Sequence, residues 1–460
     1  MSFDLSTLTI PESGPYWLKR ARVPTCFMAT TVAEAVADGD GTVLLDLLIE
    51  EGAIGRIVAS GTIAASQPPS VDMAGRHVWP TLVDMHAHLD KCHVIPRSNP
   101  DGTFTGGRVG TVRDRKFWSY DDLYRRMSFG LRCAYAHGVS AIRTHLDSHE
   151  GLAERGWAVF RDLRDEWAGR IELQAVALVP IDAFRGDYGV WLADLVEQSG
   201  GVLGGVTRAA GKDHVGTLAD TDVLLDTVLR LAADRGLDVD LHVDESDDLE
   251  AFSLPRVAAA VMRNQFANRV VCDHCVNLAL QPEDVAGRTI ELCAEAALSV
   301  VTLPTPMVYL QDRASGRTPR WRGVTLLHEL RSAGIPVAVA GDNCRDTWYA
   351  YGDHDMVDTF QQAVRIFHLD HPLIDVPAVV GPVPSEMIRA PSHGRVAVGG
   401  PARLMLFAAR TINELLSRPQ ADRIVLHRGR RLRDRLPDYE ELDDLMSAPI
   451  SAVEVEEAAG

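Results

Sequence analysis

The stretch Thr81–Pro96 reads TLVDMHAHLDKCHVIP and anchors the interpretation of the whole chain. An apolar run that starts at Thr81 ends in His86 and His88, and Asp90 and Lys91 follow directly. Side chains two residues apart on a strand leave the same face, so the two imidazoles can point into one space. Polar groups at this density are costly to bury unless something pairs them. The stretch therefore predicts a buried strand that ends at a functional site.

Eight short β-branched runs recur along the chain, with longer helical patterns between them. The runs are HVWPTLVDMHAH (from His77), VSAIRTHLD (from Val139), IELQAVALVP (from Ile171), GVLGGVTRAA (from Gly201), LDVDLHVDE (from Leu237), RVVCDHCV (from Arg269), LSVVTLPTP (from Leu298) and IPVAVAGDN (from Ile335). Asp122–His137 and Asp222–Asp234 are examples of the helical patterns. Strands that alternate with helices are typical of a parallel sheet, and eight pairs in about 300 residues predict a (β/α)8 TIM barrel.

The two ends of the chain differ from its central part in sequence pattern. Short strand-like runs separated by Gly-rich turns occupy the region from Tyr16 to Met73, and the same pattern occurs from Gly394 onward. We therefore expect one small β-sandwich domain composed from both termini. The predicted boundaries are 1–79 for its N-terminal part, 80–393 for the barrel, and 394–460 for its C-terminal part plus a loosely held acidic tail.

The bulk composition restricts the class of protein. The chain has 460 residues, 46% of them hydrophobic, and a net charge of −18. Because no cluster of basic residues is interleaved with aromatics, nucleic acid and anionic membranes are not expected partners; the basic run Arg428–Arg435 is interpreted as a solvated or ion-paired loop. The N-terminus lacks a secretory signal pattern, and seven scattered cysteines indicate a reducing compartment, so a cytoplasmic location is predicted.

Polar residues end four of the predicted barrel strands. His242 and Glu245 follow the fifth strand, His274 ends the sixth, and Asp342 ends the eighth. Singly, each has an ordinary explanation, such as a core histidine or a helix cap. Together with the first strand they place four imidazoles and two carboxylates at one mouth of the barrel, and three histidines with one aspartate form a donor set suited to Zn²⁺ or Fe²⁺. The predicted metal ligands are His86, His88, His242 and Asp342.

These motifs resemble the amidohydrolase superfamily, and the pair His242 and Glu245 narrows the resemblance to its mononuclear aminohydrolases. The segments HAHLDK, RTHLD, HVDESDD and GDNCRDTWYAYGDHDM are similar to the branch that contains cytosine deaminase and N-isopropylammelide amidohydrolase. The resemblance spans roughly Val78 to Phe360.

The resemblance implies a hydrolytic deaminase that acts on a small nitrogen heterocycle through one divalent ion, Zn²⁺ or Fe²⁺. It implies that Glu245 shuttles a proton to a ring nitrogen and then to the departing amine. His274 is expected to polarise the attacking water and to stabilise oxygen charge, and Asp342 to accept a proton as the tetrahedral adduct collapses. We also expect a homo-oligomer.

Four further residues are predicted to bind the substrate. By resemblance, Lys91 lines the site, although a surface lysine or an ion pair with Asp90 is an alternative. Trp348 resembles an aromatic that covers the base, with a core tryptophan as its alternative. Ile181 stands where cytosine deaminases have a glutamine, and Asn343 replaces an aspartate. Because buried hydrogen-bonding groups enforce discrimination, cytosine itself is in doubt, and another aminopyrimidine, an aminotriazine or a related heterocycle is as plausible.

Two rival functions remain open. A two-metal cyclic amidase of the hydantoinase type uses a carboxylated lysine after the fourth strand, where Lys212 lies. A barrel without catalysis, serving as a scaffold, is the other. Three residue groups are assigned only modest roles: His145 supports the site, Cys272 and Cys275 pack a strand rather than bind zinc, and His93–Gly107 is a loop that covers the pocket. No role is predicted for Cys92.

Overall fold

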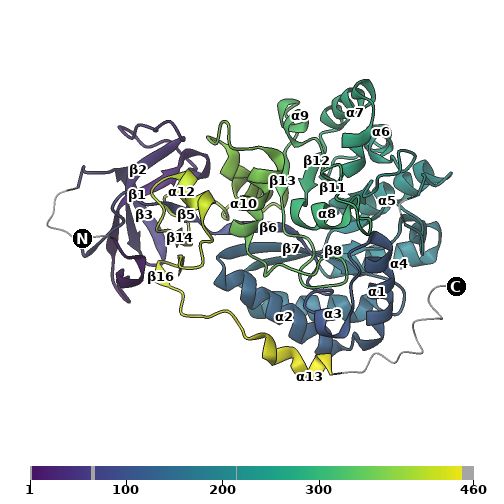
Figure 1. The fold of residues 1–460 in the computed structure, drawn as a ribbon, viewed down its shortest axis with the longest axis horizontal. Coiled ribbons are helices and arrows are strands. Elements are labelled where there is room, and N and C mark those ends of the chain that lie inside the picture. The colour runs from purple at the N-terminus through teal and green to yellow at the C-terminus, as the bar shows by residue number, and fades with distance from the viewer. Residues whose placement is uncertain (1–2, 64–67, 214, 448–460) are drawn as a thin grey trace.

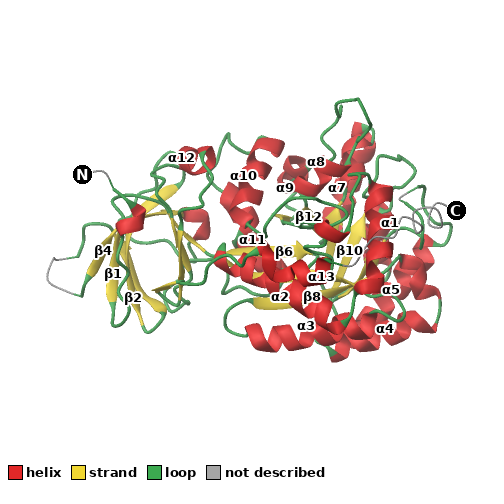
Figure 2. Ribbon diagram, turned by 60° about the horizontal axis from the view of Figure 1, so that its bottom comes forward, coloured by secondary structure: helices red, strands yellow, loops and turns green. Residues whose placement is uncertain are grey.

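The computed structural model describes residues 3–63, 68–213 and 215–447. A β-domain built from both ends of the chain lies beside a larger α/β domain, as Figures 1 and 2 show. The acidic stretch 448–460, which we expect to be a loosely held tail, lies outside the described residues. In the described part of the chain, no helix combines the length and the apolar character needed to cross a bilayer.

The α/β domain contains the parallel strands that the sequence predicts. They form a three-stranded sheet in the order β6-β7-β8 and a five-stranded sheet in the order β13-β12-β11-β10-β9. Their bounds are β6 Leu82–Ala87, β7 Val139–Asp147, β8 Glu172–Leu178, β9 Leu203–Val206, β10 Val239–Val243, β11 Val270–His274, β12 Ser299–Thr302 and β13 Val337–Val339. Isolated parallel bridges, rather than continuous ladders, join the two sheets at Val176 with Val202, at Pro180 with Val206, and at Ala87 with Asp342.

Helices surround these strands, as Figure 2 shows. Their bounds are α1 Phe104–Asp114, α2 Tyr120–Ala136, α3 Ala153–Trp167, α4 Asp187–Gln198, α5 Thr221–Arg235, α6 Leu254–Arg263, α7 Glu283–Glu295, α8 Pro304–Leu310, α9 Leu327–Ser332, α10 Met356–Phe367 and α11 Pro382–Met387. The predicted helices Asp122–His137 and Asp222–Asp234 correspond to α2 and α5. The side chain of Ser119 caps α2 by accepting from the Asp122 backbone N–H, and Gly236 ends α5 in the left-handed conformation that glycine favours.

Two four-stranded sheets form the β-domain. One has the order β3-β2-β1-β4 and comes from the N-terminal flank; the other has the order β16-β15-β14-β5 and combines both ends of the chain. The bounds are β1 Tyr16–Pro24, β2 Thr42–Glu50, β3 Ala53–Ala59, β4 Ser70–Asp72, β5 Val78–Pro80, β14 Leu404–Leu406, β15 Ile424–His427 and β16 Arg430–Arg431, with α12 at Ile412–Ser417. The composite β-domain is thus confirmed, whereas the exact boundaries after residues 79 and 393 stay a prediction.

One predicted strand belongs to two sheets. The run from His77 to His88 is expected to be a single barrel strand, but β5 pairs with β14 in the β-domain, and the barrel strand begins only at Leu82. Between them, the Thr81 N–H bonds to the carbonyl of Arg403. Hydropathy could not reveal this division because both halves of the run are buried.

The chain returns from the β-domain to the barrel at its C-terminal end. After β16 it runs along α2 to η8 (Tyr439–Leu442) and α13 (Asp443–Met446), as Figure 1 shows. Leu442 and Met446 pack with Phe129 and Cys133 of α2. In the basic run, Arg433 pairs with Glu12 at 2.8 Å and Arg430 donates to the Pro11 carbonyl at 2.8 Å. The expectation of an ion-paired loop is therefore met by Arg433, whereas Arg430 bonds to the backbone.

Candidate active site

Four side chains that the sequence singles out meet where the barrel strands end. His86 lies on β6 and His88 one residue beyond its end, His242 lies on β10, and Asp342 follows β13. Backbone contacts position Asp342, because its N–H donates to the His86 carbonyl at 2.8 Å and the Gly341 N–H donates to the Asp84 carboxylate at 2.9 Å. We call His86, His88, His242 and Asp342 the donor cluster.

The donor atoms of this cluster converge. His88 Nε2 lies 3.3 Å from His86 Nε2, 3.4 Å from His242 Nε2 and 3.2 Å from Asp342 Oδ1. His86 Nε2 lies 3.5 Å from the same oxygen. Ligand atoms at 2.0–2.1 Å from a tetrahedral zinc ion are separated by about 3.4 Å, so the spacing fits such an ion. Both oxygens of the buried Asp342 carboxylate lack a hydrogen-bond donor within the described structure, which a cation would compensate.

A second layer of polar side chains lies beneath the donor cluster. Asp273 Oδ2 is 2.9 Å from His86 Nδ1, 3.7 Å from His242 Nδ1 and 3.3 Å from His145 Nε2. His145 Nε2 is also 3.4 Å from Asp240, which accepts from Arg143 at 2.9 Å. We call Asp273, His145, Asp240 and Arg143 the support layer. Because Asp273 faces the Nδ1 atoms, the Nε2 atoms of His86 and His242 are left for a ligand.

The support layer offers a second possible grouping for a metal. His86, His145, His242 and Asp273 also place ligand atoms within 4.8 Å of one another. Neither His145 nor Asp273 is among the residues that line the pocket, whereas His88, His242 and Asp342 are. A nucleophile generated at the lower position would therefore not face a substrate. Lys212, which the two-metal alternative requires, is exposed and does not line the pocket either.

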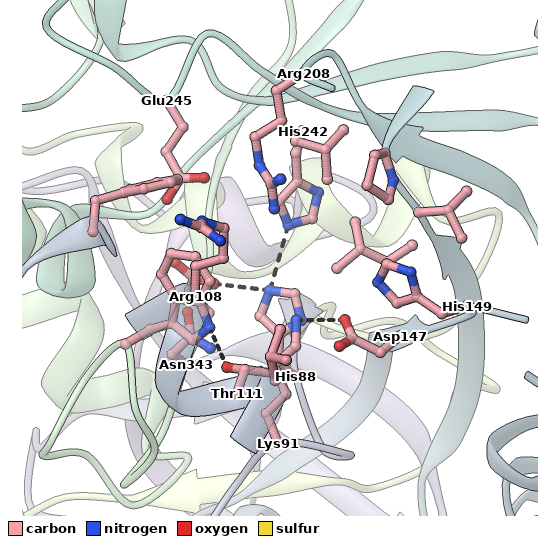
Figure 3. A pocket seen from close by; sticks show the side chains of 18 of the residues that line it. His88, Lys91, Arg108, Thr111, Asp147, His149, Arg208, His242, Glu245 and Asn343 are labelled. Carbon is pink, nitrogen blue, oxygen red and sulfur yellow. Dashed lines mark hydrogen bonds and ion pairs between the residues drawn. The ribbon is translucent and has the colours of Figure 1, made fainter. Parts of the chain in front are cut away.

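A pocket of about 600 Å³ opens above the donor cluster. Figure 3 shows His88 and His242 pointing toward one another at this pocket, with Glu245 nearby. Glu245 Oε1 lies 3.9 Å from His274 Nδ1, and both side chains line the pocket. Burial, reinforced by the charge of Asp342, raises the pKa of Glu245 to about 8. A carboxyl group with such a pKa can hold a proton or release it near neutral pH.

Lys91 is buried and lines the pocket, so it is not a surface lysine. Its partner is Asp147 rather than Asp90: Lys91 Nζ lies 3.0 Å from Asp147 Oδ1, while an Asp90 oxygen accepts from the Asp147 backbone N–H at 2.7 Å. Burial acts to lower the pKa of Lys91. The nearby carboxylates of Asp147 and Asp90 outweigh this effect and hold that pKa above its usual range. Lys91 Nζ also lies 3.3 Å from His88 Nδ1. Lys91 thus links the donor cluster to the pocket wall.

Two of the other predicted substrate residues line the pocket and one does not. Asn343 donates from Nδ2 to Asp346 at 2.7 Å, and Trp348 donates from Nε1 to Thr111 at 2.8 Å. Ile181 lies instead in the hydrophobic core, where η5 begins, and its predecessors Val179 and Pro180 line the pocket. The predicted contact between substrate and residue 181 therefore has no support in the geometry.

The predicted covering loop His93–Gly107 is partly helical. Its end forms the first turn of α1, which the Thr103 side chain caps by accepting from the Gly106 N–H at 2.9 Å. Helix α1 packs closely on Trp348, because a Cβ atom added at Gly107 would lie 2.7 Å from that ring. The loop reaches the pocket through Phe104, and Arg108 and Thr111, which follow it in α1, also line the wall.

Several charged or polar residues of the pocket wall are not among the site residues predicted from the sequence. Arg108, Arg115, Arg208, Asp147 and His149 line it, and Figure 3 shows most of them around the cavity. Asp147 belongs to the run RTHLD at the end of β7, where its position alone could have identified it. The three arginines carry no recognisable motif, since they come from α1, from the 3₁₀ turn that follows it, and from the loop after β9.

Cys272 on β11 and Cys275 just after it pack in the core. Cys272 and Cys275 are fully buried, and Cys275 Sγ lies 3.7 Å from the Cys272 carbonyl. All seven cysteines lie in the described part of the chain and are free thiols. The placement agrees with the expected packing role of the pair.

Comparisons with known proteins agree with this geometry. The Amidohydrolase family profile matches residues 130–432. A pterin deaminase from Rhizobium rhizogenes is 48% identical over 448 residues, which covers 96% of this chain and 99% of that protein. An N-isopropylammelide isopropyl amidohydrolase from a Pseudomonas species is 24% identical over 68% of this chain and 75% of its own length. The fold is similar to that of 5-methylcytosine deaminase from Klebsiella pneumoniae bound to 5-fluorocytosine, with a TM-score of 0.77, 23% identity, and coverage of 92% of this chain and 98% of that one.

Proposed function

The chain belongs to the amidohydrolase family, and from this premise we propose that it hydrolytically removes an exocyclic amino group from a nitrogen heterocycle. Water adds to the ring carbon that bears the amine, the carbon–nitrogen bond breaks, and a ring carbonyl and ammonia are the products. The observation that carries the proposal is the convergence of four donor atoms beneath a pocket whose wall also contains Glu245 and His274.

The donor cluster is proposed to hold one divalent ion, Zn²⁺ or Fe²⁺. When bound, such an ion lowers the pKa of water and so supplies a nucleophile near neutral pH. Three imidazole nitrogens and one carboxylate oxygen suit either ion. Asp273 Oδ2 lies 2.9 Å from His86 Nδ1 and 3.7 Å from His242 Nδ1, so we assign the support layer the role of orienting the ligands without binding the ion itself.

Glu245, His274 and Asp342 are proposed to handle the protons and charge of the reaction. Glu245 takes a proton from water, delivers it to a ring nitrogen of the substrate, and then protonates the leaving amine. His274, 3.9 Å from Glu245, stabilises the oxygen charge of the tetrahedral adduct. Asp342 accepts the hydroxyl proton as the adduct collapses. The raised pKa of Glu245, about 8, suits a group that must both take and give a proton.

The substrate that we propose is a 2-amino-4-oxopteridine. The extensive match to a pterin deaminase supports this bicyclic class, and the pocket is lined by aromatic and polar side chains of the kinds that small-molecule sites use. Lys91, Asn343 and Trp348 are proposed to contact the rings. Trp348 lies against Phe104 with 4.9 Å between ring centroids, which creates an aromatic wall for a planar ligand.

Release of ammonia, or of isopropylamine from the N-isopropyl compound, across a panel of heterocycles tests the proposal. The purified chain, loaded with Zn²⁺ or Fe²⁺, is supplied with 2-amino-4-oxopteridine, cytosine and N-isopropylammelide. We expect turnover of the pteridine to exceed that of the other two, with the dioxopteridine as the product. Opening of a ring instead would support the cyclic amidase alternative, and no product from any compound in a metal-loaded sample would support the scaffold alternative.

A cytoplasmic location and a homo-oligomeric assembly are also proposed. The first rests on the composition of the sequence, in which seven free cysteines accompany a large core. Gel filtration with light scattering tests the second, and a mass equal to that of one chain would contradict it.

A further inference from the structure

A second group of metal-binding residue types lies outside the pocket. Cys92 and His93 follow the end of β6, and His354 lies just before α10. Each offers one ligand atom, and these three atoms lie within 4.8 Å of one another. We call these residues the Cys92 cluster. None of the three lines the pocket above the donor cluster, so the proposed deamination leaves them without a role.

The Cys92 cluster is buried and short of hydrogen-bond partners. Cys92 is fully buried, and His93 and His354 are 2% and 7% exposed. Neither ring nitrogen of His93 has a hydrogen-bond partner within the described structure, and neither does Nε2 of His354. A buried imidazole without a partner is costly. The two imidazole rings and the thiol therefore form a group of possible metal ligands, and three of the ring nitrogens have no hydrogen-bond partner within the described structure.

The surrounding structure leaves room at the donor atoms. A Cβ atom added at Gly130 of α2 would lie 3.0 Å from His354 Nε2 and 3.4 Å from Cys92 Sγ, so the glycine keeps α2 from blocking them. The ring of Phe129 lies 4.7 Å from that of His93, and the ring of Tyr439 lies 5.9 Å from it. These aromatic rings exclude water from one side. His354 also lines a second pocket, so the cluster borders a cavity on that side.

We propose that Cys92, His93 and His354 bind a second divalent cation of the Zn²⁺ type, separate from the ion at the donor cluster. One thiolate and two imidazoles supply three of the four ligands that Zn²⁺ prefers, and water completes the set. Binding displaces the proton that Cys92 Sγ now donates to the Leu89 carbonyl at 3.0 Å, and that proton passes to solvent. The ion would tie the segment after β6 to the loop before α10.

The metal content of donor-specific variants tests the proposal. The full chain and its variants are saturated with Zn²⁺, passed through a desalting column and measured by elemental analysis. We expect Cys92→Ala and His354→Gln each to lose one equivalent relative to wild type. Cys293→Ala is the matched control, because it removes an equally buried thiol on α7 and should keep the full metal content.

Cobalt substitution separates this site from the donor cluster. Thiolate bound to Co²⁺ gives a near-ultraviolet charge-transfer band, and of the two sites only the Cys92 cluster contains sulfur. We expect the band in the Co²⁺-loaded wild type and in His242→Ala, and its absence in Cys92→Ala. Because the band is read in His242→Ala, this result does not depend on the donor cluster or on deaminase activity.

Gly130→Ala provides a test that keeps every donor. The added methyl group would occupy the space beside His354 Nε2 and Cys92 Sγ, so we expect the cobalt band to be weakened or lost while circular dichroism stays unchanged. A wild-type chain without a thiolate–cobalt band, together with equal zinc content in wild type and Cys92→Ala, would overturn the proposal.

Discussion

The donor cluster and the support layer lie next to each other in the barrel and contain similar residue types, yet their environments differ. In the support layer, Asp240 pairs with Arg143 at 2.9 Å and Asp273 is shared among imidazoles. In the donor cluster, three Nε2 atoms and one carboxylate oxygen converge below an open pocket. The two groups thus differ in access to the pocket rather than in residue type, and under the proposed function this access separates the ligands from the groups that orient them.

The largest effect is expected from removing a ring of the donor cluster. His242→Ala should lose the bound ion and all measurable deaminase activity, because one of the three imidazole ligands of the donor cluster is gone. Elemental analysis and ammonia release measure the two losses. If the variant keeps both its ion and its activity, His242 is not a metal ligand.

Glu245→Gln should separate chemistry from metal binding. The amide cannot carry the proton, so kcat should fall by roughly 10²- to 10⁴-fold, while the ion stays bound, since Glu245 is not part of the donor cluster. Glu250→Gln, an exposed change in the same loop, is the matched control and should leave kcat unchanged. Equal kcat values for the two variants would contradict the role of Glu245.

Asp273→Asn should weaken the site without destroying it. The amide no longer fixes the Nδ1 atoms of His86 and His242, so we expect a loss of about 10- to 100-fold in metal affinity or activity. Competition with a chelator gives the affinity. Asp234→Asn on the exposed face of α5 is the control. A loss as complete as that of His242→Ala would place Asp273 among the ligands.

The smallest effect is expected at the pocket wall. In Gly107→Ala the new methyl group would meet the Trp348 ring, which must shift, so KM should rise several-fold with a smaller change in kcat. Gly156→Ala is the matched control in α3, where an added Cβ meets nothing within 4 Å. An unchanged KM in Gly107→Ala would exclude Trp348 as a wall for the substrate.

The sequence predicted those parts of the site that depend on local position. His86 and His88 share a strand face, and His242 and Asp342 end strands of one parallel array, so their convergence follows from the barrel alone. The same rule holds for Glu245 and His274, which both line the pocket. The alternation of strands and helices likewise predicted the order of the barrel strands.

Features that depend on distant pairing could not be predicted. Asp147 rather than the neighbouring Asp90 pairs with Lys91 because β6 and β7 lie side by side, a register that hydropathy does not encode. Ile181 is in the core because the chain turns into η5 directly after Pro180. The return of α13 to α2 rests on Leu442 and Met446, with Leu445 partly buried beside them, in a segment that is rich in acidic residues.

The position of the bound ion is the most direct test of whether the donor cluster is the metal site. A crystal of the Zn²⁺-loaded chain, measured at the zinc absorption edge, locates the ion by anomalous scattering. We expect a zinc ion at the floor of the pocket, bound by His86, His88, His242 and Asp342. A barrel ion found instead between His145 and Asp273, or no zinc ion in the barrel of a fully loaded sample, would contradict it.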